Sequence, residues 1–143
     1  MKSLYLVCFS LLMLTACKKE IAPVVNPAGK TKTQLLTQKN WIISKVEVDG
    51  VDKTSTAYPC ILDNVITFLT GGTGYVDEGS TKCNSADPQQ KTFTWVFQNN
   101  ETELNLAGDG MTGLPTVTQL DENTMKHSIV FGGSTIVNTY VHP

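Results

Sequence analysis

Residues 92–97 read Thr-Phe-Thr-Trp-Val-Phe, and this stretch decides the fold class. Successive side chains of a β-strand point to opposite faces, so Phe93, Trp95 and Phe97 share one face and the threonines share the other. A row of aromatic rings along one face predicts that this face lies inside the protein. The stretch therefore predicts a half-buried strand of an antiparallel sheet.

Similar segments rich in Val, Ile, Thr and Phe follow one another from Trp41 onward, separated by short turns such as Gly71-Gly72, Asn99-Asn100 and Gly132-Gly133. Gly and Asn tolerate the positive φ that short hairpin loops need. We predict eight strands, at 41–48, 65–69, 73–77, 92–98, 103–106, 116–120, 124–131 and 134–141. Closure removes the edges of such a meander, so we expect an all-β fold, an eight-stranded antiparallel up-and-down barrel. A barrel of this size is filled by side chains or holds one small ligand.

Two further features of the barrel follow from the sequence. Residues 33–39 carry Leu35 and Leu36 and predict a short N-terminal helical turn that plugs one end of the barrel. Alternation predicts further inward-facing side chains, namely Ile66, Phe68, Leu104, Leu106, Met125, Ile129, Phe131, Ile136 and Tyr140. His127 falls on the same apolar face, where a lone histidine is more often a satisfied interior side chain than a ligand or a base.

The composition limits the classes of function. With 143 residues, the chain has the length of one domain. It has 13 acidic residues, 11 lysines and no arginine, for a formal net charge of −2. Because recognition of phosphates and bases depends heavily on arginine, we expect no nucleic-acid partner.

The N-terminal segment predicts export. After Lys2, residues 4–14 form an apolar run of signal-peptide length, well short of the roughly 20 residues that a membrane-spanning helix needs. The motif Leu14-Thr15-Ala16-Cys17 resembles the lipobox of bacterial lipoproteins, which implies removal of residues 1–16 and acylation of Cys17. The alternative is an ordinary signal peptide followed by a chance cysteine.

Acylation at Cys17 would make the membrane a partner, because two acyl chains anchor a protein stably without spanning the bilayer. No aspartate follows Cys17, which favours the outer membrane of a bacterial cell envelope. Residues 17–32 contain two prolines and a glycine without apolar periodicity, so we expect a flexible tether. The barrel domain would then span 33–143.

Cys8 lies in the signal segment and Cys17 in the lipobox, so Cys60 and Cys83 remain for the folded domain. In an exported protein this pair predicts a disulfide. Zinc is an alternative, but two thiols without Cys-x-x-Cys spacing or a nearby histidine make a poor tetrahedral site. A catalytic thiol is a further alternative, although no neighbouring basic residue would lower the pKa of either cysteine.

Several of these features occur in the order and spacing of a known family. They are Trp41 at the first strand, Cys60-Ile-Leu-Asp63 before Ile-Thr-Phe68, the Gly74 hairpin, Asp77-Glu78-Gly79 ahead of Cys83, and Trp95-Val-Phe. Residues 34–141 thus resemble the lipocalin-like domain family of bacterial lipoproteins. The resemblance implies a Cys60–Cys83 bridge beside the second hairpin and, by analogy of fold, carriage of a ligand. Lys39 stands where wider lipocalins have the glycine of Gly-x-Trp, and the arginine of their last strand is absent.

No catalytic constellation or cofactor motif emerges. The chain has no Gly-x-Ser-x-Gly elbow, and only His127 and His142 could act as a base. The carboxylates Asp63, Asp77, Glu78 and Asp87 cluster in sequence near the cysteines and could converge on calcium, but each could equally cap a turn or face water. We therefore expect no enzyme, no metal and no cofactor.

Two hypotheses about function follow. The first is a lipid-anchored binding module that holds a small hydrophobic or amphipathic ligand in the barrel. Its lining residues would come from Trp41, Phe68, Phe93, Trp95, Phe97, His127 and Tyr140. The second is an accessory lipoprotein of an outer-membrane protein complex, which has a fully packed interior and uses its outer surface.

Overall fold

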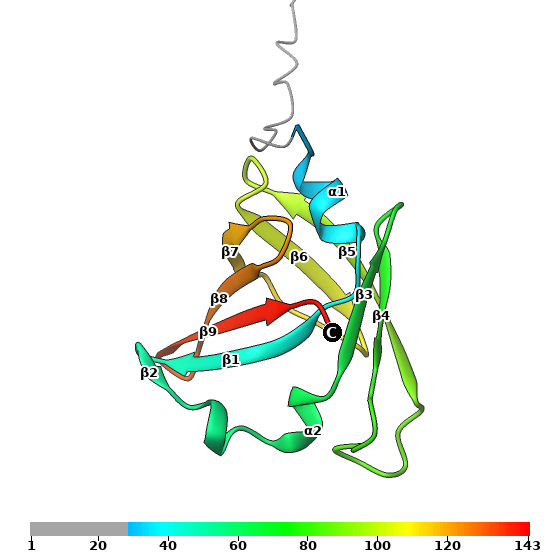
Figure 1. Cartoon of the computed structure of the whole chain (residues 1–143), viewed down its shortest axis with the longest axis vertical. Coiled ribbons are helices and arrows are strands. Elements are labelled where there is room, and N and C mark those ends of the chain that lie inside the picture. Colours follow the sequence, from blue (N-terminus) through cyan, green and yellow to red (C-terminus); the bar gives the residue numbers. More distant parts are fainter. Residues whose placement is uncertain (1–28) are drawn as a thin grey trace, which may run out of the picture.

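The computed structural model describes residues 29–143; the predicted signal peptide, Cys17 and most of the predicted tether lie outside them. The described chain is a single antiparallel sheet of nine strands in the order β2-β1-β9-β8-β7-β6-β5-β4-β3 (Figure 1). The strands are β1 Ile42–Val48, β2 Val51–Asp52, β3 Val65–Leu69, β4 Thr73–Asp77, β5 Gln90–Gln98, β6 Glu103–Gly108, β7 Thr116–Leu120, β8 Met125–Phe131 and β9 Ser134–Val141. The prediction of an all-β antiparallel fold is confirmed.

The predicted number of strands is wrong by one. Each of the eight predicted segments is a strand, and the extra strand is the two-residue β2. Asp49 and Gly50 have φ of 52° and 78°, and this tight turn pairs Val51 with Val48. An Asp-Gly pair after an apolar strand is a strong hairpin signal, so the sequence carried the information for β2.

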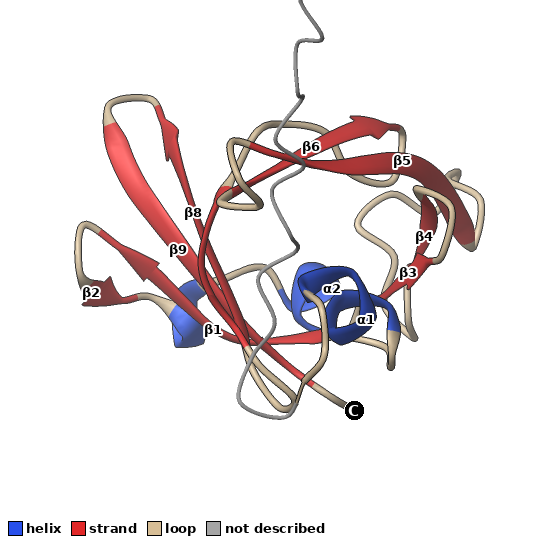
Figure 2. Ribbon diagram, turned by 90° about the horizontal axis from the view of Figure 1, so that it is seen from above, coloured by secondary structure: helices blue, strands red, loops and turns tan. Residues whose placement is uncertain are grey.

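The sheet curls strongly but does not close by a strand ladder, which corrects the predicted closed barrel (Figure 2). Its two ends meet at a single bridge, where Trp41 and Ile66 exchange two backbone hydrogen bonds of 2.9 and 2.8 Å. Beyond this bridge, the edge of β1 that does not pair with β9 is already hydrogen-bonded to the segment around Lys53 and Thr54. Lys53 donates to the carbonyl of Val46, and the Val46 amide donates to the hydroxyl of Thr54. Only the start of β1 therefore remains available to β3.

Three short helices accompany the sheet within the described residues. Helix α1, Lys32–Thr37, confirms the predicted helical turn, begins with a capping box between Thr31 and Gln34, and buries Leu35 and Leu36. The 3-10 helix η1, Thr54–Thr56, and helix α2, Pro59–Leu62, were not predicted. Within residues 29–143, no helix has both the length and the apolar character needed to cross a membrane.

Strand alternation predicts most of the interior correctly, with Ile66, Phe68, Leu104, Leu106, Met125 and Tyr140 buried. Ile129 and Ile136 are only half-buried, and Phe131 departs furthest from the prediction, because 76% of its surface is exposed. The ladder between β7 and β8 ends at the pair Thr116 and Ser128, so β8 continues beyond its neighbour. The β8–β9 hairpin therefore projects from the curved sheet (Figure 2). Phe131 is the last residue of β8 and so lies next to the turn of this hairpin.

Candidate functional site

The structure gathers the residues predicted to line a ligand cavity in one interior, as two groups separated along the sheet. Phe68, Phe93, Trp95 and Phe97 come from β3 and β5, His127 and Tyr140 come from β8 and β9, and Trp41 lies at the bridge that joins the sheet ends. All are buried except Phe97, which is partly buried.

The β3–β5 group is a packed aromatic wall, formed by Phe68, Phe93, Trp95 and Phe97. The ring of Phe68 makes edge contacts with Phe93 and Trp95 at centroid separations of 5.3 and 5.9 Å. Trp95 meets Phe97 in the same way at 5.9 Å. The Trp95 indole also donates to the carbonyls of Leu69 and Thr73. Since the rings contact one another and the indole is satisfied, these side chains chiefly stabilise the fold.

Trp41 lies next to helix α1, at the bridge that joins the start of β1 to β3. Its indole donates to the carbonyl of Leu36 at 2.9 Å, and its side chain is fully buried. The ring of His142 lies 4.2 Å from the Trp41 ring, and its nitrogens lie within hydrogen-bond distance of the carbonyls of Asn40 and Glu122. Trp41 is thus placed to hold α1, β1 and the C-terminus together.

The second group is polar, and it surrounds His127. Nε2 of His127 lies 2.9 Å from the Tyr140 hydroxyl and 3.3 Å from the Asn138 side-chain nitrogen. Burial raises the pKa of Tyr140 far above its ordinary value, so the hydroxyl keeps its proton and can either donate to Nε2 or accept from it. The Asn138 amide nitrogen can only donate, so we assign Nε2 as the acceptor and place the ring proton on Nδ1.

Nδ1 of His127 is buried and has no hydrogen-bond partner in the described chain. Burial lowers the pKa of His127 to about 4, so the imidazole is neutral at neutral pH. A buried N–H without an acceptor destabilises a fold by about 1–3 kcal/mol, and native interiors rarely contain one without a reason. His127 thus carries a donor that the protein itself does not use. The sequence indicated the position of His127 but not its partners.

The cross-strand register extends the inner face of this group toward the hairpin tip. Val46, Asn138, His127 and Val117 lie directly opposite one another on β1, β9, β8 and β7. The next inward row is Val48, Ile136 and Ile129, and these side chains are only half-buried. Phe131 lies on the same face one step further. We call Val48, Ile129, Phe131 and Ile136 the hairpin strip.

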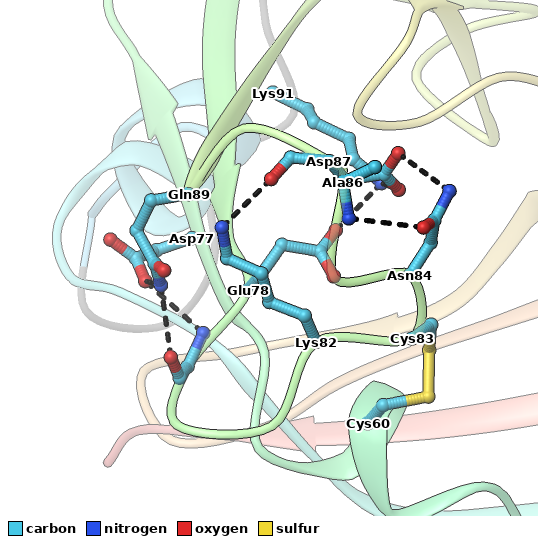
Figure 3. A network of polar contacts seen from close by, with 11 residues as sticks. Cys60, Asp77, Glu78, Lys82, Cys83, Asn84, Ala86, Asp87, Gln89 and Lys91 are labelled. Carbon is cyan, nitrogen blue, oxygen red and sulfur yellow. Dashed lines mark hydrogen bonds and ion pairs between the residues drawn. A yellow bond between two sulfur atoms is a disulfide. The ribbon is translucent and has the colours of Figure 1, made fainter.

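The predicted disulfide between Cys60 and Cys83 is confirmed, and it joins α2 to the loop between β4 and β5 (Figure 3). Beside it, the Lys91 ammonium pairs with Glu78 at 2.8 Å and with Asp87 at 2.7 Å. Lys82 donates to the carbonyl of Asp87. The loop is therefore tied down by ionic and covalent contacts together.

Asp63, which follows α2, and Asp77, at the start of this loop, accept hydrogen bonds from protein donors, although Oδ1 of Asp63 has no partner. Asp63 accepts from Ser80 and Thr81, and these hydrogen bonds outweigh partial burial and lower its pKa. Hydrogen bonds from Gln89 and Gln90 lower the pKa of Asp77. Within residues 29–143, no group of three or more His, Cys, Asp or Glu side chains is arranged to hold a metal ion.

Hollows on the molecular surface border parts of the aromatic wall. One, of about 620 Å³, lies between α1 and the β5–β6 turn and is bordered by Thr33, Trp95, Phe97 and Glu101. Another, of about 410 Å³, lies over the outer face of β4, β5 and β6. Both are wide open to solvent, whereas the unpaired donor of His127 is inside.

Comparison with known proteins supports the fold. The model of a family described as Lipocalin-like domain matches residues 37–127, which include the aromatic wall, the disulfide and His127. A search of curated proteins finds no match.

Proposed function

Since the chain belongs to the lipocalin-like domain family, we propose that it is a non-enzymatic binding module for a small hydrophobic or amphipathic molecule. The ligand would lie against the inner face of the curved sheet. This location keeps His127 and Tyr140 from the predicted lining and leaves out the aromatic wall, because the wall is already packed by its own rings. The β8–β9 side is the better candidate.

One observation carries the proposal: the unpaired, buried Nδ1 of His127. Tyr140 and Asn138 orient the imidazole through Nε2, so the free donor has a defined direction. In the strand register, the half-buried apolar row of Val48, Ile129 and Ile136 directly follows the row that contains His127. A polar donor beside an apolar surface is the arrangement that an amphipathic ligand requires.

The proposal includes a lipid anchor at Cys17, supported by the Leu-Thr-Ala-Cys motif in the sequence. The anchor would hold the binding module at the outer membrane of the cell envelope, where apolar molecules are available. Intact mass measurement of the N-terminal peptide tests it: we expect Cys17 as the first residue, with acyl chains attached. Cleavage elsewhere, with an unmodified Cys17, would contradict the anchor while leaving the binding proposal in place.

Native mass spectrometry tests the binding itself. The whole protein, purified from its host under mild conditions, should carry extra mass that is lost on denaturation. After removal of that mass, incubation with a lipid extract of the host should restore it. A native mass equal to the denatured mass, with no uptake from the extract or from a broad panel of lipophiles, would refute the proposal.

A further inference from the structure

We propose that the Nδ1–H of His127 recognises the polar head of the ligand, and that this head is an uncharged hydrogen-bond acceptor such as a ketone, ester or amide carbonyl. The inference rests on the proposed function and specifies the chemical class of its ligand.

The tautomer of His127 sets the role of the ligand. Both groups facing Nε2 carry hydrogens, namely the Tyr140 hydroxyl at 2.9 Å and the Asn138 side-chain nitrogen at 3.3 Å. Nε2 has one lone pair and accepts, so Nδ1 carries the proton and can only donate. The complementary ligand atom is therefore an acceptor. A ligand hydroxyl could serve only through its oxygen.

The cross-strand neighbours and hydrogen-bond partners of His127 disfavour a charged head. Its neighbours in the cross-strand row are Val46, Asn138 and Val117, and its hydrogen-bond partners are Asn138 and Tyr140. None of these side chains is a cation. A carboxylate placed there would be a buried charge without a counter-ion, which is strongly unfavourable. A carbonyl oxygen satisfies the donor without that penalty.

In this proposal the apolar body of the ligand extends from His127 toward the tip of the β8–β9 hairpin. His127 pairs with Val117 and Ser128 with Thr116, and β7 offers no partner to residues 129–131 of β8. We place the apolar body along the half-buried hairpin strip, beyond the point where Ile129 lies close to Gly113 of the β6–β7 connection. Phe131, 76% exposed, would cover its outer end. This role gives a physical reason for an exposed phenylalanine.

A matched ligand series tests the head group. The probes are 2-decanone, decane and decanoate, which share an alkyl chain and differ in the head. Affinities are measured for the whole protein in lipid nanodiscs by displacement of the solvatochromic naphthyl ketone prodan. We expect 2-decanone to bind about tenfold more tightly than decane, as one hydrogen bond to a buried donor predicts. Decanoate should bind least tightly.

Histidine-labelled protein gives a direct readout of the contact. The described chain contains His127 and His142, so His142 serves as an internal reference. On addition of 2-decanone, the ¹⁵N and ¹H signals of His127 Nδ1–H should shift, and those of His142 should not. Decane should shift neither. The variant His127→Phe should bind 2-decanone and decane equally.

A pair of surface variants keeps the test independent of folding. Phe131 and Val130 are neighbours with similar exposure, 76% and 70%, but they lie on opposite faces of β8. Phe131→Ser should weaken binding of both 2-decanone and decane severalfold, whereas Val130→Ser should not change it. Equal effects of the two variants would contradict a ligand on the hairpin strip.

The outcomes separate this inference from the proposed function. Equal binding of ketone and alkane to the native protein, with unmoved Nδ1–H signals, would overturn the role of His127 and leave an apolar binding site. Tightest binding of decanoate would overturn the uncharged head. Failure of all three probes, together with a native mass equal to the denatured mass, would refute the binding function as well.

Discussion

The aromatic wall on β3 and β5 and the polar group on β8 and β9 face the same interior but are built differently. In the wall, Phe68, Phe93 and Trp95 fill one another's space and the one polar atom, the Trp95 indole nitrogen, is satisfied. Around His127, the Tyr140 ring also packs edge-on at a centroid separation of 4.9 Å, but the imidazole carries a buried nitrogen without a partner. In one curved sheet, the aromatic wall on β3 and β5 stabilises the fold, and the proposed ligand site lies on the β8–β9 side.

The largest effect should come from the wall. Trp95→Ala removes a buried ring that contacts Phe68 and Phe97, so the free energy of unfolding should fall by about 3–5 kcal/mol. Val96→Ala, on the outer face of the same strand, should change it by less than about 0.5 kcal/mol. Urea denaturation measures both. Similar values for the two variants would show that the wall is not the stabilising region.

The disulfide should contribute next. Cys60 and Cys83 are 23 residues apart, and the chain-entropy model gives roughly 3–4 kcal/mol for a loop of that length. The double variant Cys60→Ala and Cys83→Ala should lose this amount in urea denaturation. The reduced wild-type protein should lose a similar amount. An oxidised protein no more stable than the double variant would indicate that the Lys91 ion pairs already fix the loop.

Lowering the pH should reduce the free energy of unfolding through His127, whereas the aromatic wall has no group that titrates. The folded-state pKa of His127 is about 4, below the ordinary value of 6.5, so the unfolded chain takes up the proton first as the pH falls. Stability is therefore complete above about pH 6.5 and declines toward pH 4, where the loss reaches about 3 kcal/mol.

The variant His127→Gln isolates this effect, because its amide oxygen can still accept from Tyr140 and does not titrate. The aspartates with lowered pKa, such as Asp77 and Asp121, destabilise the protein only at lower pH, near and below their ordinary value of 3.8. Unfolding free energies of the wild type and the variant should diverge between pH 6.5 and 4. Parallel curves would mean that His127 is hydrated in the native state.

The wall was predictable from the sequence, whereas the polar group was only partly so. Alternation in residues 92–97 fixes which rings point inward, because a strand's side chains have a period of two whatever the strand pairs with. The same rule placed His127 inside. Its partner Tyr140 is 13 residues away and on another strand, so the contact depends on the register of the β8–β9 hairpin.

The exposure of Phe131 and the incomplete closure of the sheet could not be predicted from local sequence patterns. Alternation assigns Phe131 to the inner face, and the face is correct, but burial requires a neighbouring strand, and β7 ends too early. The incomplete closure likewise depends on Lys53 and Thr54 occupying the edge of β1. Such competition for an edge is a tertiary effect that a strand-by-strand analysis does not contain.

The smallest effect should come from the hairpin strip. Phe131→Ser and Val130→Ser replace side chains that are already largely in water, so each should change the free energy of unfolding by no more than about 0.5 kcal/mol. Thermal or urea denaturation checks this. A loss of 2 kcal/mol or more for Phe131→Ser, with none for Val130→Ser, would mean that the ring packs onto the inner face in solution. In that case the hairpin strip would belong with the wall as a stabilising surface, and the unpaired edge of β8 would be covered by the protein itself.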